Sequence, residues 1–151
     1  EIGYNYRMSN ICAGIGRGQM EVLDQHVASR RAMHDFYLEL FKDIKGVSVF
    51  SAPNSDYFSN YWLTTILIDS SKTNGISRET LRLALEAENI ESRPLWKPMH
   101  LQPIFEKYPY YGNNVAETLF ENGLCLPSGS NLTDSDRERI ATVIKSVFVD
   151  R

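Results

Sequence analysis

The chain has 151 residues, of which 42% are hydrophobic and 23% charged, and this composition predicts one folded domain with its own core. The formal net charge of −3 at pH 7 does not indicate the strongly basic face that binds nucleic acid. The sequence contains no apolar run near the ~18 residues that span a bilayer and no signal peptide, so we expect a cytoplasmic protein without a membrane segment.

One long helix, straight or bent, is predicted over most of the first 45 residues. Ser9 or Asn10 can cap it, because their side chains accept hydrogen bonds from the free amides of a first helical turn. The helix is predicted to reach about Lys45 and to stop at Gly46. Apolar residues recur through this region at helical spacing: Met8, Ile11, Cys12, Ile15, Val22, Leu23, Val27, Met33, Tyr37, Leu40, Phe41 and Ile44.

Glycines at positions 14, 16 and 18 lie in the first part of this helix. Each glycine inside a helix costs about 1 kcal/mol relative to alanine. Three of them so close together indicate that another backbone packs against this part of the helix. The alternative is a break between two helices at residues 14–18.

The rest of the chain alternates between strands and helices. The predicted elements are strands at 47–50 and 61–69, a helix at about 78–89, an edge strand or extended loop at 90–100, a helix at 114–122, a short strand within 124–129 and a helix from 133 to the C-terminus. Pro94 and Pro98 make the 90–100 segment extended, because each fixes one φ angle and removes one backbone donor.

Capping residues mark the ends of the later helices. Ser77 can cap one helix, and Thr133 with Asp136 three residues later resembles a capping box. Asn114 opens another helix, and Gly123 stands in the usual terminating position after it. The apolar residues expected to face the core from the first and last of these helices are Leu81, Ala84, Leu85, Ile140, Val143, Ile144 and Val147.

This order of elements predicts a single α/β or α+β domain, in which helices cover one side of a small sheet. The long first helix is more than so small a sheet needs, so its other flank could pack against something outside this chain. The chain begins at Glu1 rather than at a methionine, which favours a piece of a longer protein over a processed small one. Cys12 and Cys125 are isolated, and we expect both to be buried thiols of a reducing compartment.

The segment RPLWKPMH, residues 93–100, holds the strongest candidates for a binding site. Arg93 suits a bidentate grip on phosphate or carboxylate. Trp96 offers a flat face to a base or sugar ring, or else packs at the edge of the sheet. His100 could act as an acid, a base or an anion donor, or else make a structural hydrogen bond. The prolines favour the binding interpretation, because they lower the entropy lost when a loop is fixed in place.

Other candidate residues give weaker signals. Lys97 could form a Schiff base with an aldehyde, but nothing adjacent would depress its pKa, so a cation that binds phosphate or faces water is favoured. Asn5 and Arg7 lie just before a helix start, where free amides attract anions. His26 and His34 have no third ligand nearby, so no metal site is predicted.

Three segments together carry a resemblance. They are GYNYRMSNICAGIGRGQMEVLD (3–24), SRPLWKPMHLQPIF (92–105) and CLPSGSNLT (125–133). In this order and at these separations they resemble the C-terminal part of the DegT/DnrJ/EryC1/StrS family of pyridoxal phosphate-dependent nucleotide-sugar aminotransferases. The RPLWKPMHLQP segment is most similar to the branch that makes UDP-4-amino sugars of the bacillosamine type.

The resemblance implies that this chain and a large domain outside it have different roles in one enzyme. Residues 1–45 would link to an N-terminal large domain outside this chain, and residues 46–151 would form the small C-terminal domain of a fold-type I enzyme. The large domain would carry the lysine that binds the cofactor, so no catalytic residue is expected here. Asn5 and Arg7 match the segment that reaches the cofactor phosphate of the neighbouring subunit in a homodimer. Arg93, Trp96, Lys97 and His100 match the loop that borders the nucleotide-sugar pocket.

Two functions from different classes follow. The first is the C-terminal part of an aminotransferase that moves an amino group, from glutamate, to a 4-keto UDP-sugar for surface polysaccharide or glycan synthesis; the chain alone would be inactive. The second is a stand-alone module that binds a nucleotide sugar or a partner domain without catalysis. A small enzyme that uses Lys97 is disfavoured, because no activating neighbours are visible in the sequence.

Overall fold

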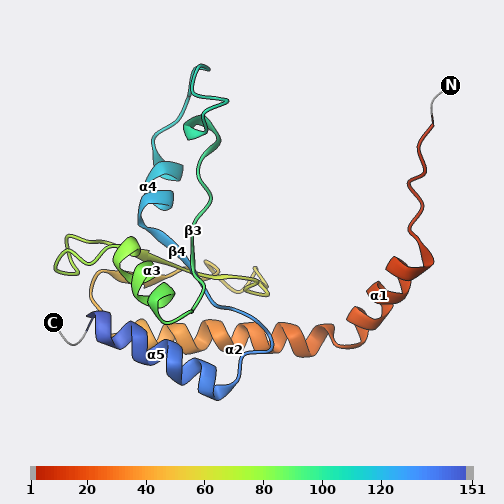
Figure 1. Cartoon of the computed structure of the whole chain (residues 1–151), viewed down its shortest axis with the longest axis horizontal. Coiled ribbons are helices and arrows are strands. Elements are labelled where there is room, and N and C mark those ends of the chain that lie inside the picture. The colour runs from red at the N-terminus through yellow and green to blue at the C-terminus, as the bar shows by residue number, and fades with distance from the viewer. Residues whose placement is uncertain (1–2, 149–151) are drawn as a thin grey trace.

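The computed structural model describes residues 3–148 (Figure 1). The first two residues of the predicted N-terminal loop and the last three of the predicted final helix lie outside this range. The elements within it are α1 (Asn10–Glu21), α2 (Leu23–Phe41), β1 (Val47–Val49), β2 (Thr64–Ile68), α3 (Arg78–Ala87), β3 (Arg93–Pro94), the short 3₁₀ helix η1 (Met99–Leu101), α4 (Val115–Asn122), β4 (Gly123–Leu126) and α5 (Asp134–Phe148). The predicted mixed α/β fold class and the order of elements are confirmed.

The described strands form one antiparallel sheet in the order β1-β2-β4-β3. Ile66 lies opposite Leu124, and Thr65 lies opposite Cys125. Because residues directly opposite each other point to the same face of an antiparallel sheet, this register separates two faces. Ile66 and Leu124 belong to the buried face, whereas Thr65 and Cys125 belong to the second one.

The core lies between the buried face of the sheet and three helices, α2, α3 and α5. The side chains that form it come from all of these elements: Met33, Tyr37, Phe41, Ile66, Ile68, Ile76, Leu81, Leu85, Ile90, Leu124, Leu126, Ile140, Val143, Ile144 and Val147. Burial of this apolar surface is the main favourable term in folding. The helical spacing had predicted the core positions of α3 and α5 correctly. The second face of the sheet is only partly covered, by α4 near Leu67.

The predicted long helix consists of two helices, α1 and α2, separated by one residue, so the bent form of the prediction is nearer to the structure than the straight one. The helix is interrupted at Val22, whose φ of −115° and ψ of 4° are not helical, and α2 ends at Phe41 rather than Lys45. The predicted alternative, a break at residues 14–18, is wrong, because these residues lie inside α1. Figure 1 shows α1 pointing away from the body. The apolar spacing continues across Val22, so it did not reveal where the helix is interrupted.

No residue of α1 is buried within the described part of the chain. Ile11 and Ile15 are exposed, and a Cβ added at Gly14, Gly16 or Gly18 would meet nothing within 4 Å. Within residues 3–148, no backbone packs against these glycines as expected. Cys12, on the same helix, is exposed, so its predicted burial is wrong.

Local hydrogen bonds confirm most of the predicted caps. Ser9 accepts from the backbone N–H of Cys12 at 3.2 Å. Ser77 and Thr80 form a complete capping box at the start of α3. Gly123 ends α4 as predicted, but its φ of −97° is not the left-handed value usual at such positions, and it begins β4 directly. Glycine is needed there for space rather than for conformation, because an added Cβ would lie 2.2 Å from Leu95 Cδ1.

Asp136 fixes the start of α5, and its charge makes this contribution dependent on pH. One of its carboxylate oxygens accepts from the Thr133 hydroxyl at 2.7 Å and from the Thr133 N–H at 2.8 Å. These hydrogen bonds, the side-chain one first, lower the pKa of Asp136 below its ordinary value of 3.8. A lowered pKa in the folded state gives stability that is present above the ordinary value and is lost as the pH falls through the folded value.

We therefore expect Asp136→Asn to be less stable than the parent chain at pH 7, and the difference to shrink as the pH is lowered below about 4. Thermal unfolding of both chains between pH 7 and pH 3 measures this. Glu138→Gln, on the same helix, is the control and should track the parent at every pH. A difference between Asp136→Asn and the parent that is constant over this range would contradict the role of the charge.

Among residues 3–148, no helix combines the length and the apolar composition that a bilayer crossing requires.

Candidate functional site

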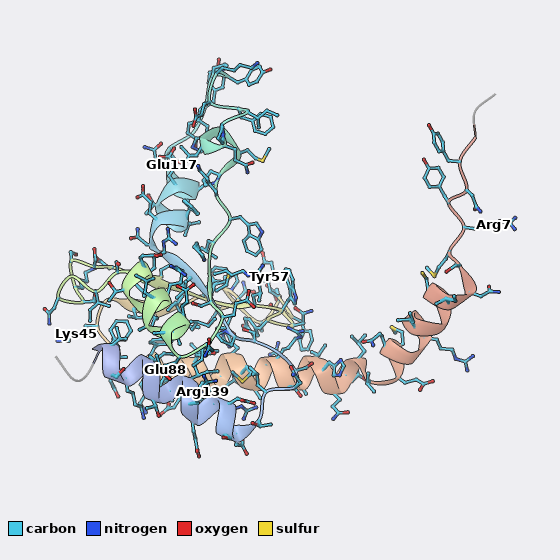
Figure 2. The ribbon with its side chains drawn as sticks, viewed as in Figure 1. Arg7, Lys45, Tyr57, Glu88, Glu117 and Arg139 are labelled. Atoms are coloured by element: carbon cyan, nitrogen blue, oxygen red, sulfur yellow. The ribbon has the colours of Figure 1, made fainter. Side chains whose placement is uncertain are left out.

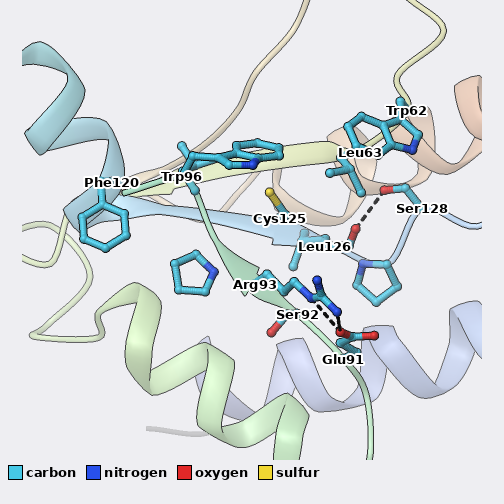
Figure 3. A pocket seen from close by; sticks show the side chains of 13 residues that line it. Trp62, Leu63, Glu91, Ser92, Arg93, Trp96, Phe120, Cys125, Leu126 and Ser128 are labelled. Atoms are coloured by element: carbon cyan, nitrogen blue, oxygen red, sulfur yellow. Dashed lines mark hydrogen bonds and ion pairs between the residues drawn. The ribbon is translucent and has the colours of Figure 1, made fainter. Parts of the chain in front are cut away.

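A cavity of about 780 Å³ opens beside β3 and β4 (Figure 3). Residues that line it include Trp62, Arg93, Trp96, Phe120, Cys125 and Ser128. A second cavity of about 580 Å³ shares Trp62, Leu63 and Trp96 with the first, and extends to Phe50 and Tyr57. The two indoles therefore belong to both cavities, on the part of the sheet that α4 leaves open.

The loop that carries Trp62 is fixed to α2 by buried and charged contacts. His34 stacks on the ring of Tyr61 at 3.6 Å, and its Nε2 lies 3.1 Å from the Phe50 carbonyl oxygen. Arg30 donates from Nη1 to the carbonyl oxygens of Trp62, at 2.6 Å, and Ser128, at 3.1 Å. These contacts hold the Trp62 backbone in place while its indole stays 60% exposed.

Trp96 is positioned by the edge strand before it. Arg93 lies opposite Cys125 in the β3–β4 register, and the Leu95 N–H donates to the Gly123 carbonyl at 3.3 Å. Trp96 follows directly and is 67% exposed. An exposed indole beside a cavity is available to stack on a planar or ring-shaped ligand.

The polar groups of the cavity are suited to binding a ligand rather than to catalysing a reaction. Arg93 donates from Nε to Glu91 at 2.7 Å, and its side chain is 77% exposed, so the guanidinium can also reach an anion. Ser128 accepts from the Thr64 N–H at 2.8 Å and donates to the Leu126 carbonyl, so its hydroxyl is committed to the backbone. Burial raises the pKa of the Cys125 thiol, which keeps it protonated and weakly nucleophilic.

The structure brings two of the four predicted residues of the 93–100 segment to one cavity. Arg93 and Trp96 line it, whereas Lys97 and His100 do not. Lys97 is exposed, and its backbone carbonyl accepts from Gln102 at 3.4 Å. His100 lies 2.5 Å from a carboxylate oxygen of Glu117, in keeping with the alternative of a structural hydrogen bond.

Arg7 lies far from the body, on the segment before α1 (Figure 2), and Asn5 precedes it by two residues on the same segment. The Asn5 side chain accepts from the Arg7 N–H at 3.0 Å, which orders the backbone between them. Both side chains are exposed. The predicted phosphate-binding and sugar-binding residues therefore belong to two separate places in one chain.

Sequence reasoning missed Trp62 and the partner of His100. Trp62 lay within the predicted strand at 61–69. Its place near the start of that strand, where side chains are often exposed, was the one signal that could have identified it. Glu117 gave no local signal, because it is separated from His100 by 17 positions and is joined to it only by the fold. Among residues 3–148, no group of three or more His, Cys, Asp or Glu side chains could hold a metal ion.

Comparisons with known proteins match nearly the whole chain. Residues 1–145 match the DegT/DnrJ/EryC1/StrS aminotransferase family. The chain is 43% identical over 152 residues to a Bacillus subtilis protein named "Putative pyridoxal phosphate-dependent aminotransferase EpsN", covering 98% of this chain and 38% of that protein. It is 34% identical over 150 residues to the GDP-perosamine synthase of Escherichia coli O157:H7, covering 99% and 39%.

A solved structure agrees with these matches. The fold superposes with a TM-score of 0.83, at 26% identity, on DesI in the presence of its TDP-sugar product, covering 99% of this chain and 38% of that one. The chain thus spans less than two fifths of the length of each of these relatives, and corresponds to their C-terminal portion. From the match over residues 1–145, the chain belongs to the DegT/DnrJ/EryC1/StrS aminotransferase family.

Proposed function

We propose that this chain is the C-terminal part of a pyridoxal phosphate-dependent aminotransferase that transfers an amino group from glutamate to a 4-keto nucleotide sugar in the cytoplasm. The match over residues 1–145 to an aminotransferase family carries the proposal. The names of two relatives support a nucleotide-sugar substrate, since one is a GDP-perosamine synthase and another contains a TDP-sugar product. The finer choice of a UDP-sugar, destined for surface polysaccharide, rests on the likeness of residues 93–103 to the bacillosamine-type branch.

In this proposal residues 1–45 link to the large domain and residues 46–151 form the small domain. The second half of α2 belongs to the core of the small domain as well, because Met33, Tyr37 and Phe41 are buried there. The lysine that binds the cofactor lies in the large domain. The exposed apolar side chains of α1, such as Ile11 and Ile15, are available to pack in the proposed homodimer of the longer protein.

The residues of this chain suit the phosphate end of the cofactor but not its ring. Arg7 and Asn5 offer a guanidinium and an amide at the start of a helix, which is donor chemistry that phosphate prefers. Pyridoxal phosphate supplies the electron sink for transamination when it is bound. The residues of this chain would bind and orient the cofactor and the substrate. Arg7 and Asn5 would bind the phosphate of the cofactor in the neighbouring subunit. Arg93 and Trp96 hold the diphosphate and a ring of the nucleotide sugar.

A stand-alone binding module is the second candidate. It is favoured by one observation: a cavity of about 780 Å³, bordered by the exposed indoles of Trp62 and Trp96, opens on the body of this chain. Calorimetry with a UDP-sugar separates the candidates. Tight binding by the 151-residue chain alone favours the module, whereas binding that requires the longer protein favours the aminotransferase.

Treatment of the chain with pyridoxal phosphate and borohydride is expected to leave no specific label. Lys97 is exposed and does not line the cavity beside Trp96, so reduction should give only scattered, substoichiometric products on surface lysines. Peptide mass spectrometry measures this, with Lys97→Arg as the control. Stoichiometric label on Lys97, lost in Lys97→Arg, would indicate a self-contained site and overturn the proposal. So would conversion of a 4-keto sugar and glutamate by the chain alone.

A further inference from the structure

Residues 95–114, here called the arm, project from the body between β3 and α4 (Figure 1). In the arm only Pro98 is buried. Apart from the Leu95 N–H at its base, which donates to the Gly123 carbonyl, its backbone hydrogen bonds are local, such as Gln102 N–H to the Met99 carbonyl and Tyr108 N–H to the Phe105 carbonyl. A segment with so little buried surface is expected to open easily unless a specific contact holds it.

His100 makes that contact. Its Nε2 lies 2.5 Å from Glu117 Oε1 on α4, and the two side chains are only 18% and 24% exposed. Its ring stacks on Tyr110, with centroids 3.7 Å apart and planes inclined by 16°. His100 lies on the outgoing limb of the arm, the part that follows β3, and Tyr110 lies on the returning limb, the part that leads to α4. The imidazole therefore joins both limbs to α4. A short, partly shielded hydrogen bond to a carboxylate is among the stronger kinds in proteins.

Gly112 leaves room for this stack. A Cβ added there would lie 2.1 Å from the Tyr110 hydroxyl oxygen and 2.4 Å from Cζ. No substitution could be accommodated without moving the Tyr110 ring, and the ring could not move without leaving His100. The returning limb is thus shaped around the His100–Tyr110 pair.

The helix that receives His100 is itself anchored. Arg78 on α3 donates from Nε to the Glu121 carbonyl at 2.8 Å, and its guanidinium lies 5.2 Å from the centroid of the Phe120 ring. At the base of the arm, Leu95 packs closely over Gly123. The His100–Glu117 contact therefore joins the arm to the body rather than to another mobile segment.

We propose that His100 is a positioning residue rather than a ligand contact. With Glu117, Tyr110 and Gly112 it forms a latch that holds the arm. The latch thereby fixes the position of Lys97 and the path of the backbone after Trp96. The functional half of this inference rests on the proposed nucleotide-sugar site; the latch itself does not.

Amide hydrogen exchange of the 151-residue chain tests the latch. In Glu117→Ala and in Tyr110→Leu, exchange at Leu101, Gln102, Phe105 and Tyr108 is expected to accelerate about tenfold or more, because a hydrogen bond to a charged group is lost or its partner is displaced. Exchange at Ile66 and Leu124 in the sheet should not change, which verifies the fold.

Two matched controls sharpen the result. Tyr110→Phe keeps the ring, and Tyr111→Leu removes an exposed neighbour of the stacked ring; both should exchange like the parent. Parent-like exchange in Glu117→Ala and Tyr110→Leu would overturn the latch. Acceleration in Tyr111→Leu as large as in Tyr110→Leu would do so as well.

Nucleotide-sugar affinity in the longer protein tests the positioning role. His100→Asn and Glu117→Ala should weaken binding by the same factor, and the double variant should bind no more weakly than either one. A larger loss in His100→Asn, with a further loss in the double variant, would show direct contact and overturn this role. If the parent protein binds no nucleotide sugar, the proposed function fails, while the exchange result still decides the latch.

Discussion

Gly123→Ala is expected to lower the free energy of unfolding by about 2–3 kcal/mol, the range of a severe overpacking substitution. Gly123 begins β4, in the middle of the sheet, directly after α4. An added Cβ would lie 2.2 Å from Leu95 Cδ1 and 2.5 Å from the Leu119 carbonyl oxygen. The Leu95 side chain could turn aside, but the Leu119 carbonyl belongs to helix α4, so relief requires the helix and the strand to move apart.

Urea unfolding followed by tryptophan fluorescence measures this loss. Gly16→Ala is the matched control, because a Cβ there meets nothing within 4 Å and alanine favours a helix by about 1 kcal/mol over glycine. It should leave the urea midpoint unchanged or raised, with more helical circular dichroism. A midpoint for Gly123→Ala equal to that of the parent would show that the junction of α4 and β4 adapts without cost.

Arg7→Ala in the longer protein is expected to lower the affinity for pyridoxal phosphate by about 10- to 100-fold, the effect of losing a charge-assisted hydrogen bond to a phosphate. Arg7 is exposed and lies far from the body of its own chain (Figure 2), so its proposed partner is the cofactor of the neighbouring subunit. Cofactor titration measures the change. Lys145→Ala, which removes an exposed cation from α5, is the control and should bind as the parent does.

Mixed dimers test whether Arg7 acts across the subunit boundary. Arg7→Ala subunits are combined with subunits that lack the cofactor-binding lysine of the large domain. One site of such a dimer then has an intact lysine from the first subunit and an intact Arg7 from the second. Recovery of transaminase activity on mixing is expected. Activity that stays at the level of the two separate variants would place Arg7 at its own subunit's site or at none.

The local capping signals and the helical spacing were sufficient to predict most elements of the body. Ser77 caps α3 as predicted, with Thr80 as its partner, and Thr133 and Asp136 form the predicted capping-box hydrogen bonds, because each pair is only three residues apart. The spacing of Leu81 and Leu85 along α3 matched their burial for the same reason. Arg93 and Trp96 were selected from residue type and from the neighbouring prolines, and both line the cavity, while their role in binding stays a prediction.

Features that depend on contacts between distant segments could not be predicted in this way. The apolar stripe of α1 resembles that of a core helix, yet nothing in this chain covers it, because spacing records that a face is apolar and not what packs on it. Gly123 was assigned to a helix end by its position, whereas the packing of Leu95 against it is what requires glycine. His100 was selected as a ligand residue, but its nearest charged partner, Glu117, is brought to it only when the arm folds back onto α4.

The sequence by itself therefore determined the family, the mixed α/β class and the ends of most helices, since these depend on short-range hydrogen bonds and on ordered motifs. Only the tertiary structure decided the bend at Val22, the exposure of Cys12 and the separation of Arg7 from Arg93. Each of these depends on how the segments of the chain are placed in space, and on which of them come into contact. Such contacts contribute free energies that no local pattern records.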